Sequence, residues 1–105
     1  MGRIKKQVFS ADQNRLSDLA RALGHPARIA ILEFLARSNS CMCGDIVEEL
    51  PLSQSTVSQH LRELKNVGLI KGDIEGTRVC YCIDNRALEQ ARRLMEKFLT
   101  TRRCC

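Results

Sequence analysis

The segment Pro51-Leu-Ser-Gln-Ser-Thr-Val-Ser-Gln-His-Leu-Arg-Glu-Leu64 decides how the chain folds. Ser53 is a preferred residue for the start of a helix, and Gly68 is a preferred terminator, so a helix is predicted from Ser53 to about Val67. The apolar residues of this helix recur at i, i+4 and i+7 and form a stripe that faces a core; they are Val57, Leu61 and Leu64.

The opposite face of this helix is polar and almost uncharged; it comprises Gln54, Ser55, Ser58, Gln59 and Arg62. A solvent-facing helix usually favours Lys, Glu and Arg, because Ser and Thr are weaker helix formers. Short hydroxyls allow close approach to a major groove, and Gln pairs bidentately with adenine, while Arg62 would reach a phosphate. The pattern favours a DNA recognition helix over the alternative, a plain polar helix. His60 is expected to be structural or to contact a phosphate rather than to ligate a metal.

Outward from this segment, the hydrophobic periodicity and the Pro and Gly positions predict the other elements. They are helices over about 10–23, 26–38 and 43–50, strands over 69–74 and 77–84 around Glu75-Gly76, and a helix over about 86–100. The predicted fold is mainly α with a small β-hairpin, a winged helix-turn-helix with a further helix at each end. Arg78 lies just past the hairpin tip, where a wing meets DNA; a solvated charge at a strand end is the alternative.

The chain has 105 residues with 17 Lys+Arg against 12 Asp+Glu, a net charge of +5. This length suits one domain over 1–105, with its core at about 10–100 and a basic, Cys-containing tail at 101–105. No apolar run approaches the ~20 residues that span a bilayer, and the basic N-terminus lacks the apolar stretch of a signal peptide. We therefore expect a cytoplasmic protein with no membrane partner.

The cysteines fall as two Cys-x-Cys pairs and one Cys-Cys, at Cys41, Cys43, Cys80, Cys82, Cys104 and Cys105. These spacings do not suggest a disulfide framework, and in a reducing compartment clustered thiols indicate a metal or redox site. Two Cys-x-Cys pairs supply four sulfurs to one ion only if the fold brings them together. The alternatives are that Cys80 and Cys82 are small buried hydrophobes and that Cys104 and Cys105 belong to an inert tail.

Four segments carry a resemblance to the ArsR family of winged-helix metalloregulators: 23–32, 41–46, 52–64 and 68–71. The resemblance implies a homodimeric repressor that leaves double-stranded operator DNA when a metal or metalloid binds, with the two terminal helices forming the dimer interface. The family's DNA-contacting positions match Gln54, Ser55, Ser58 and Gln59 on the 53–67 helix.

In the arsenic-sensing branch, three cysteines open the first helix of the helix-turn-helix. Cys41 and Cys43 match the first two, whereas Ile46 stands where the third would be. Trivalent arsenic is expected to take three thiolates, so the resemblance requires another sulfur. Cys104 or Cys105 would supply it first, and Cys80 or Cys82 second. The expected inducer is trivalent arsenic or antimony ahead of cadmium, lead or zinc, and no cofactor is expected for folding.

Two other functions compete with this reading. The same cysteines would serve a redox- or persulfide-sensing repressor, because exposed low-pKa thiols oxidise reversibly. A thiol enzyme or metal carrier without DNA binding is disfavoured, because no Cys-x-x-Cys and no Cys/His/Asp constellation is present. The sequence therefore predicts a protein that is not an enzyme.

Overall fold

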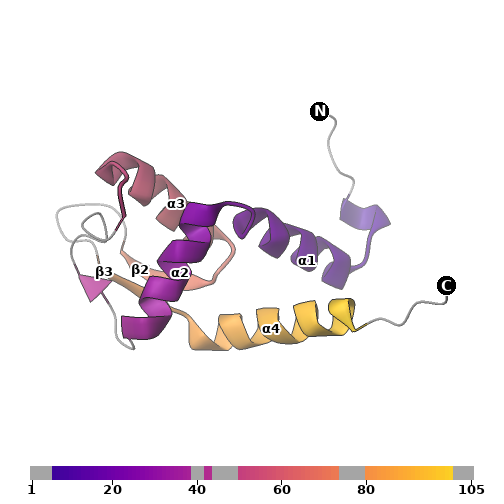
Figure 1. The fold of residues 1–105 in the computed structure, drawn as a ribbon. Coiled ribbons are helices and arrows are strands. Elements are labelled where there is room, and N and C mark those ends of the chain that lie inside the picture. The colour runs from indigo at the N-terminus through magenta and orange to yellow at the C-terminus, as the bar shows by residue number, and fades with distance from the viewer. Residues whose placement is uncertain (1–5, 39–41, 44–49, 74–79, 101–105) are drawn as a thin grey trace.

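The computed structural model of the chain describes residues 6–38, 42–43, 50–73 and 80–100. The elements run in the order η1 (Lys6–Val8), α1 (Ala11–Ala22), α2 (Pro26–Ser38), β1 (Met42–Cys43), α3 (Gln54–Asn66), β2 (Ile70–Asp73), β3 (Cys80–Ile83) and α4 (Asn85–Leu99) (Figure 1). This mainly helical chain with a small antiparallel sheet confirms the predicted winged helix-turn-helix class. None of the described helices is long and apolar enough to cross a membrane.

Side chains at the helix starts explain where the helices begin. Ser10 and the Gln13 side chain form a capping box at α1, in which each side chain accepts from the other residue's backbone N–H. Ser53 Oγ accepts from Thr56 N at 3.3 Å and starts α3 where the sequence predicted it. The carboxylate of Asp84 caps α4 in the same way by accepting from Ala87 N at 3.1 Å.

The core lies where α1, α2, α3 and α4 converge on the sheet. Its largest fully buried side chains are Leu19, Ile31, Leu64, Leu69, Ile70 and Tyr81. In α2 the buried residues are Ile31 and Leu35, whereas Ile29 is 39% exposed. The reason is that α2 packs against both α3 and β3, and the i, i+4 pair at 31 and 35 faces them.

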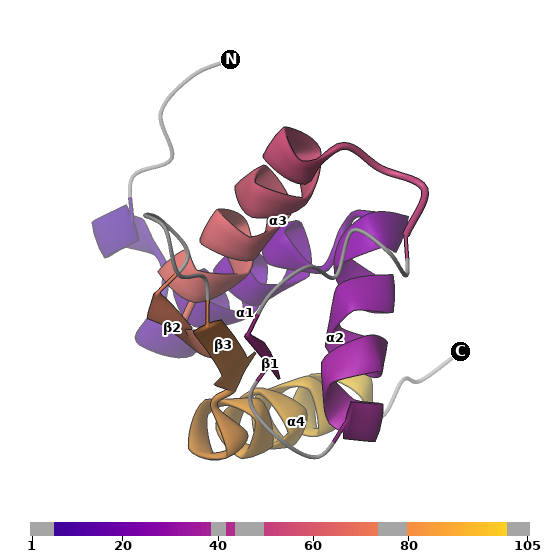
Figure 2. The same ribbon diagram turned by 90° about the vertical axis from the view of Figure 1, so that its left-hand side faces the viewer.

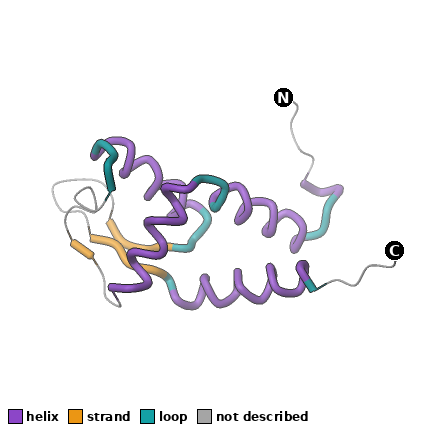
Figure 3. Tube along the Cα trace, viewed as in Figure 1, coloured by secondary structure: helices purple, strands orange, loops and turns teal. Residues whose placement is uncertain are grey.

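The sheet has the strand order β1-β3-β2, and both pairings are antiparallel (Figures 2 and 3). The predicted hairpin is present as β2 and β3, and its predicted tip lies outside the described residues. Cys43, which the sequence predicted as the start of a helix over about 43–50, lies in the strand β1, and residues 44–49 of that predicted helix lie outside the described residues. Cys43 instead pairs with Cys80 of β3, and such pairing between distant segments is invisible to local periodicity.

Gly72 holds β2 close to β3. Its φ of +124° is unfavourable for other residues, and a Cβ built there would lie 2.1 Å from the carbonyl oxygen of Cys80. Only glycine therefore fits between these strands without moving the backbone. The position of β3, and with it the position of Cys80 and Cys82, depends on this contact.

Candidate DNA-reading helix and thiol-bearing sheet

The helix α3 presents the predicted polar face to solvent. Gln54, Ser55, Gln59 and Arg62 are exposed and Ser58 is half-buried. The opposite face of α3 is packed into the core through Val57, His60, Leu61 and Leu64. A helix held in this way presents short polar side chains on a rigid support, which is the arrangement that reading base edges requires.

His60 anchors α3 rather than contacting solvent. It is only 7% exposed, and its Nδ1 accepts a hydrogen bond from Arg28 Nε at 3.1 Å. Arg28 also donates from Nη1 to the carbonyl oxygens of Arg21 and Ala22, both at 3.3 Å. One guanidinium thus joins the end of α1, the start of α2 and the middle of α3. The structural interpretation of His60 is favoured by this geometry.

The His60 ring is kept neutral by its surroundings. Burial lowers its pKa below the ordinary value of 6.5, and the nearby His25 and Arg28 lower it further, while Glu63 opposes them. The ring of His25 lies 4.4 Å from that of His60, centroid to centroid. Because Nδ1 accepts from Arg28, the single ring proton of neutral His60 resides on Nε2.

The described cysteines gather on the sheet. Cys43 lies in β1 directly opposite Cys80 of β3, and Cys82 follows two residues later in the same strand. Cys80 is joined to another cysteine in a disulfide whose other half is not among the described side chains, whereas Cys82 keeps its thiol. The sequence analysis disfavoured a disulfide framework, and the disulfide at Cys80 differs from that expectation.

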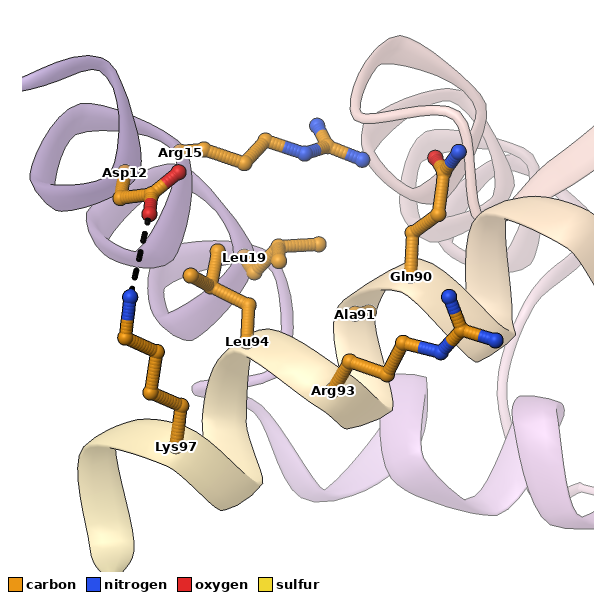
Figure 4. A pocket seen from close by; sticks show the side chains of 8 residues that line it. All are labelled: Asp12, Arg15, Leu19, Gln90, Ala91, Arg93, Leu94 and Lys97. Carbon is orange, nitrogen blue, oxygen red and sulfur yellow. Dashed lines mark ion pairs between the residues drawn. The ribbon is translucent and has the colours of Figure 1, made fainter.

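A surface groove of about 340 Å³ separates α1 from α4 (Figure 4). Leu19, Ala91 and Leu94 form its apolar part. Charged side chains surround it, with Arg15 extending across it toward Gln90 and Lys97 facing Asp12 at 4.0 Å.

The positive charge of α4 is partly balanced within the helix. Arg92 donates to Glu89 at 2.7 Å and also pairs with Glu96, and Arg93 lies 3.4 Å from Glu89. The Arg92 hydrogen bond holds the pKa of Glu89 below its ordinary value. These arginines therefore add less to a DNA-attracting field than their number in the sequence suggested.

Large apolar side chains are exposed at one end of the α1/α4 pair. Phe98 and Leu99 end α4 and are 58% and 71% exposed, and Val8 and Phe9 precede α1 and are 67% and 50% exposed. The Asp12–Lys97 ion pair shows that these two helix ends lie together. This end of the helix pair therefore leaves large apolar side chains exposed to solvent.

Several predicted site residues lie outside the described part of the chain: Arg78, Cys41, Cys104 and Cys105. Two relationships escaped the sequence analysis, namely the Arg28–His60 hydrogen bond and the pairing of Cys43 with Cys80. The first had no sequence signal. The alternation Cys41-Met42-Cys43 is a weak signal for the second, because it suits a strand as well as a helix.

Together, the fold and the exposed face of α3 define a helix-turn-helix transcriptional regulator. Residues 25–71 match the family model described as "Bacterial regulatory protein, arsR family". The chain is 39% identical over 77 residues to an uncharacterized HTH-type transcriptional regulator, MJ1325, of Methanocaldococcus jannaschii. The matched region covers 71% of this chain and 85% of that relative. It therefore belongs to the arsR family of bacterial regulatory proteins.

Two further relatives have more informative names. The "Transcriptional repressor SmtB homolog" of Synechocystis is 30% identical, covering 89% of this chain and 71% of its own length. The "Cadmium resistance transcriptional regulatory protein CadC homolog" of Staphylococcus aureus is 32% identical over a region that covers 92% of this chain and 78% of that relative. The relatives are transcriptional regulators rather than enzymes.

Proposed function

We propose that this protein is a homodimeric repressor that binds a two-fold symmetric operator in the cytoplasm. It releases the operator when a thiophilic metal or metalloid, most favourably trivalent arsenic or antimony, binds its cysteine thiolates. The observation that carries the proposal is the exposed, short-chain polar face of α3 above a fully packed core. The cadmium-resistance name of the Staphylococcus aureus relative supports a metal inducer.

The DNA contacts follow from the exposure of α3. Gln54, Ser55, Ser58 and Gln59 would meet base edges in the major groove, and Arg62 a phosphate. Arg78 would contact the DNA backbone beside the groove. In a two-fold dimer the two α3 helices would enter successive major grooves about 34–36 Å apart.

The dimer would form through α1 and α4. The exposed Val8, Phe9, Phe98 and Leu99 lie at one end of this helix pair, and covering them with a second copy removes apolar surface from water. An isologous interface of this kind gives the two-fold axis that a symmetric operator requires.

The inducer would bind Cys43 and Cys41 together with a third thiolate, from Cys104 or Cys105 or from Cys80 or Cys82. Soft thiolates favour thiophilic ions over hard cations such as magnesium. Coupling between the thiol site and DNA is expected to be about 1–3 kcal/mol, or about 5–150-fold in operator affinity.

Release of a promoter fragment tests this function. Arsenite, antimonite, cadmium, lead and zinc are titrated separately into the reduced protein bound to DNA from upstream of its own gene, with fluorescence anisotropy as the readout. We expect arsenite or antimonite to release the DNA, and Cys43→Ser to abolish that release while leaving DNA binding intact. If no ion releases the DNA, the metal-sensing function is wrong.

A redox- or persulfide-sensing repressor is the second candidate, and the disulfide at Cys80 specifically favours it. Peroxide or an inorganic polysulfide would then weaken DNA binding, and mass spectrometry would show the loss of two hydrogens or the addition of sulfur. Unchanged mass together with unchanged DNA affinity would exclude this candidate.

A further inference from the structure

One side-chain hydrogen bond joins the first turn of α2 to the buried face of α3. Arg28 Nε donates to Nδ1 of His60 at 3.1 Å. Nη1 of the same guanidinium donates to the carbonyl oxygens of Arg21 and Ala22, at the end of α1. His60 is 7% exposed and directly follows Gln59, which belongs to the exposed polar face of α3. The guanidinium therefore holds α3 in a fixed relation to the two helices that precede it.

A single proton is enough to break this bond. Neutral His60 carries its ring proton on Nε2, so a second proton has only Nδ1 to go to, and it turns that acceptor into a donor. The imidazolium would then face the guanidinium, a like charge, across the 3.1 Å that the bond spans. Protonation of His60 and the Arg28–His60 bond therefore exclude one another.

The surroundings of the ring keep the bond intact at neutral pH. Burial, the His25 ring at 4.4 Å and the Arg28 guanidinium all lower the pKa of His60 below 6.5, and Glu63 of α3 opposes them. The other charged side chains of α2 and β2, the elements that pack most closely on α3, are exposed and do not act on the ring; they are Glu33, Arg37, Lys71 and Asp73.

We propose that Arg28 is a positioning residue for operator binding, and that its bond to His60 is a proton-sensitive contact that orients α3. This inference rests on the proposed function, because it requires that α3 reads DNA. When His60 is protonated, the buried face of α3 loses its anchor on α2, and the exposed residues of α3 leave the orientation that base contacts need. Acid and the thiol ligand would thus weaken operator binding through different groups.

The proposal predicts a pH dependence opposite in sign to simple electrostatics. Added positive charge attracts phosphates, so protonation of an exposed histidine would tighten binding to DNA. The DNA-bound chain keeps His60 neutral, so below the pKa of His60 in the free chain binding releases a proton. Promoter affinity therefore falls there by up to about tenfold per pH unit, the limit for one proton.

Promoter affinity against pH tests the proposal with the full chain. Fluorescence anisotropy at constant salt measures Kd from pH 7.5 to 5.0, and circular dichroism marks the range in which each variant stays folded. We expect the Kd of the unmodified protein to rise at least about fivefold on acidification. In His60→Asn the amide oxygen still accepts from Arg28 but does not titrate, so Kd should stay within about twofold of its value at pH 7.5.

His25→Asn is the matched control, because His25 and His60 are the two histidines of the chain. His25 Nδ1 accepts from Ala27 N at 3.1 Å, and asparagine supplies a similar acceptor at the start of a helix. The Kd of this variant should still rise on acidification. The rise should begin at a higher pH, since His25 lowers the pKa of His60.

Two further measurements hold if His60→Asn does not fold. Arg28→Met lacks the bond at every pH, so it should bind the promoter more weakly than the unmodified protein at pH 7.5 and show no further loss on acidification. In nitrogen-15-labelled protein without DNA, a scalar coupling between Arg28 Nε and His60 Nδ1 should be present at pH 7.5 and vanish as the His60 ring titrates.

An equal rise of Kd in the unmodified protein and in His60→Asn would overturn the proposal and leave the proposed function intact, as would tighter promoter binding on acidification. The proposed function fails separately, if the unmodified protein does not bind the promoter at any pH. The positioning role in DNA binding then falls with it, even where the nitrogen–nitrogen coupling shows that the bond breaks on protonation.

Discussion

Arg28 Nε donates a hydrogen bond to Nδ1 of His60 at 3.1 Å, and this bond connects the start of α2 to the middle of α3. The same guanidinium reaches the last carbonyl groups of α1. The orientation of the proposed DNA-reading face relative to the two preceding helices therefore depends on one arginine and on a neutral histidine.

Acidification should weaken the fold through His60. Its pKa is lowered in the folded state, so between pH 6.5 and that lowered value the unfolded chain binds more protons than the folded chain. Stability present above pH 6.5 is consequently lost as the pH falls through this window, because protonated Nδ1 can no longer accept from Arg28. Urea unfolding from pH 7.5 down to 5.5 measures the loss, and His60→Gln should remove this part of the slope. An equal pH slope in His60→Gln would contradict the assignment.

Replacing Arg28 with methionine should cost about 1–3 kcal/mol of unfolding free energy, because it removes the donor to the His60 nitrogen and one donor from each of two helix-end carbonyls. Arg28→Lys should restore little of this unfolding free energy, since the single ammonium group of lysine cannot reproduce the planar, forked donor geometry of the guanidinium. Arg37→Met, at an exposed position in the last turn of α2, is the control and should change stability by no more than about 0.5 kcal/mol. Equal effects at the two arginines would show that the bridge contributes nothing.

The two glycines with positive φ should respond differently to alanine. At Gly68, where φ is +84° and nothing lies within 4 Å of a built Cβ, the cost is backbone strain alone, about 1–2 kcal/mol. At Gly72 the new methyl would meet the β3 backbone as well, so Gly72→Ala should cost more than about 3 kcal/mol. Chemical denaturation of both variants gives the comparison. A smaller loss at Gly72 than at Gly68 would mean that β2 and β3 separate easily.

Gln59→Ala should weaken operator binding by about 1–3 kcal/mol, because one bidentate base contact is lost. Binding to unrelated DNA should be unchanged, since that depends on phosphates. Gln90→Ala removes another exposed glutamine, from α4, and serves as the control. Anisotropy titrations with promoter and random fragments separate the two effects. An equal loss of affinity for the promoter and the random fragment would indicate that Gln59 contacts the DNA backbone rather than a base.

Arg62→Gln should weaken binding to both DNAs and reduce the slope of log K against log salt by about 1. The reason is that a phosphate contact releases a counterion and carries no sequence information. Titrations at several salt concentrations measure this slope. An unaltered slope with lost sequence preference would make Arg62 a base-reading residue.

Local chemistry predicted most of the helical fold. The capping serine at 53, proline at 26 and the glycine at 68 mark helix ends through their own backbone preferences, and the structure places α2 and α3 accordingly. The exposed face of α3 also followed from periodicity, because a helix of known phase has only one way to bury Val57, Leu61 and Leu64. Which face of α2 is buried could not be predicted in this way, since several apolar residues compete for its inner face and its packing partners choose among them.

The sequence alone determined the class of this protein: a helix-turn-helix regulator whose polar recognition face and clustered cysteines are local features of the chain. Only the tertiary structure decided which groups meet. Cys43 faces Cys80 because β1 pairs with β3, and Arg28 reaches His60, 32 residues later, because α2 packs on α3. Local preferences act over a few residues, whereas these contacts arise from strand pairing and core packing between distant segments, and no spacing in the sequence encodes them.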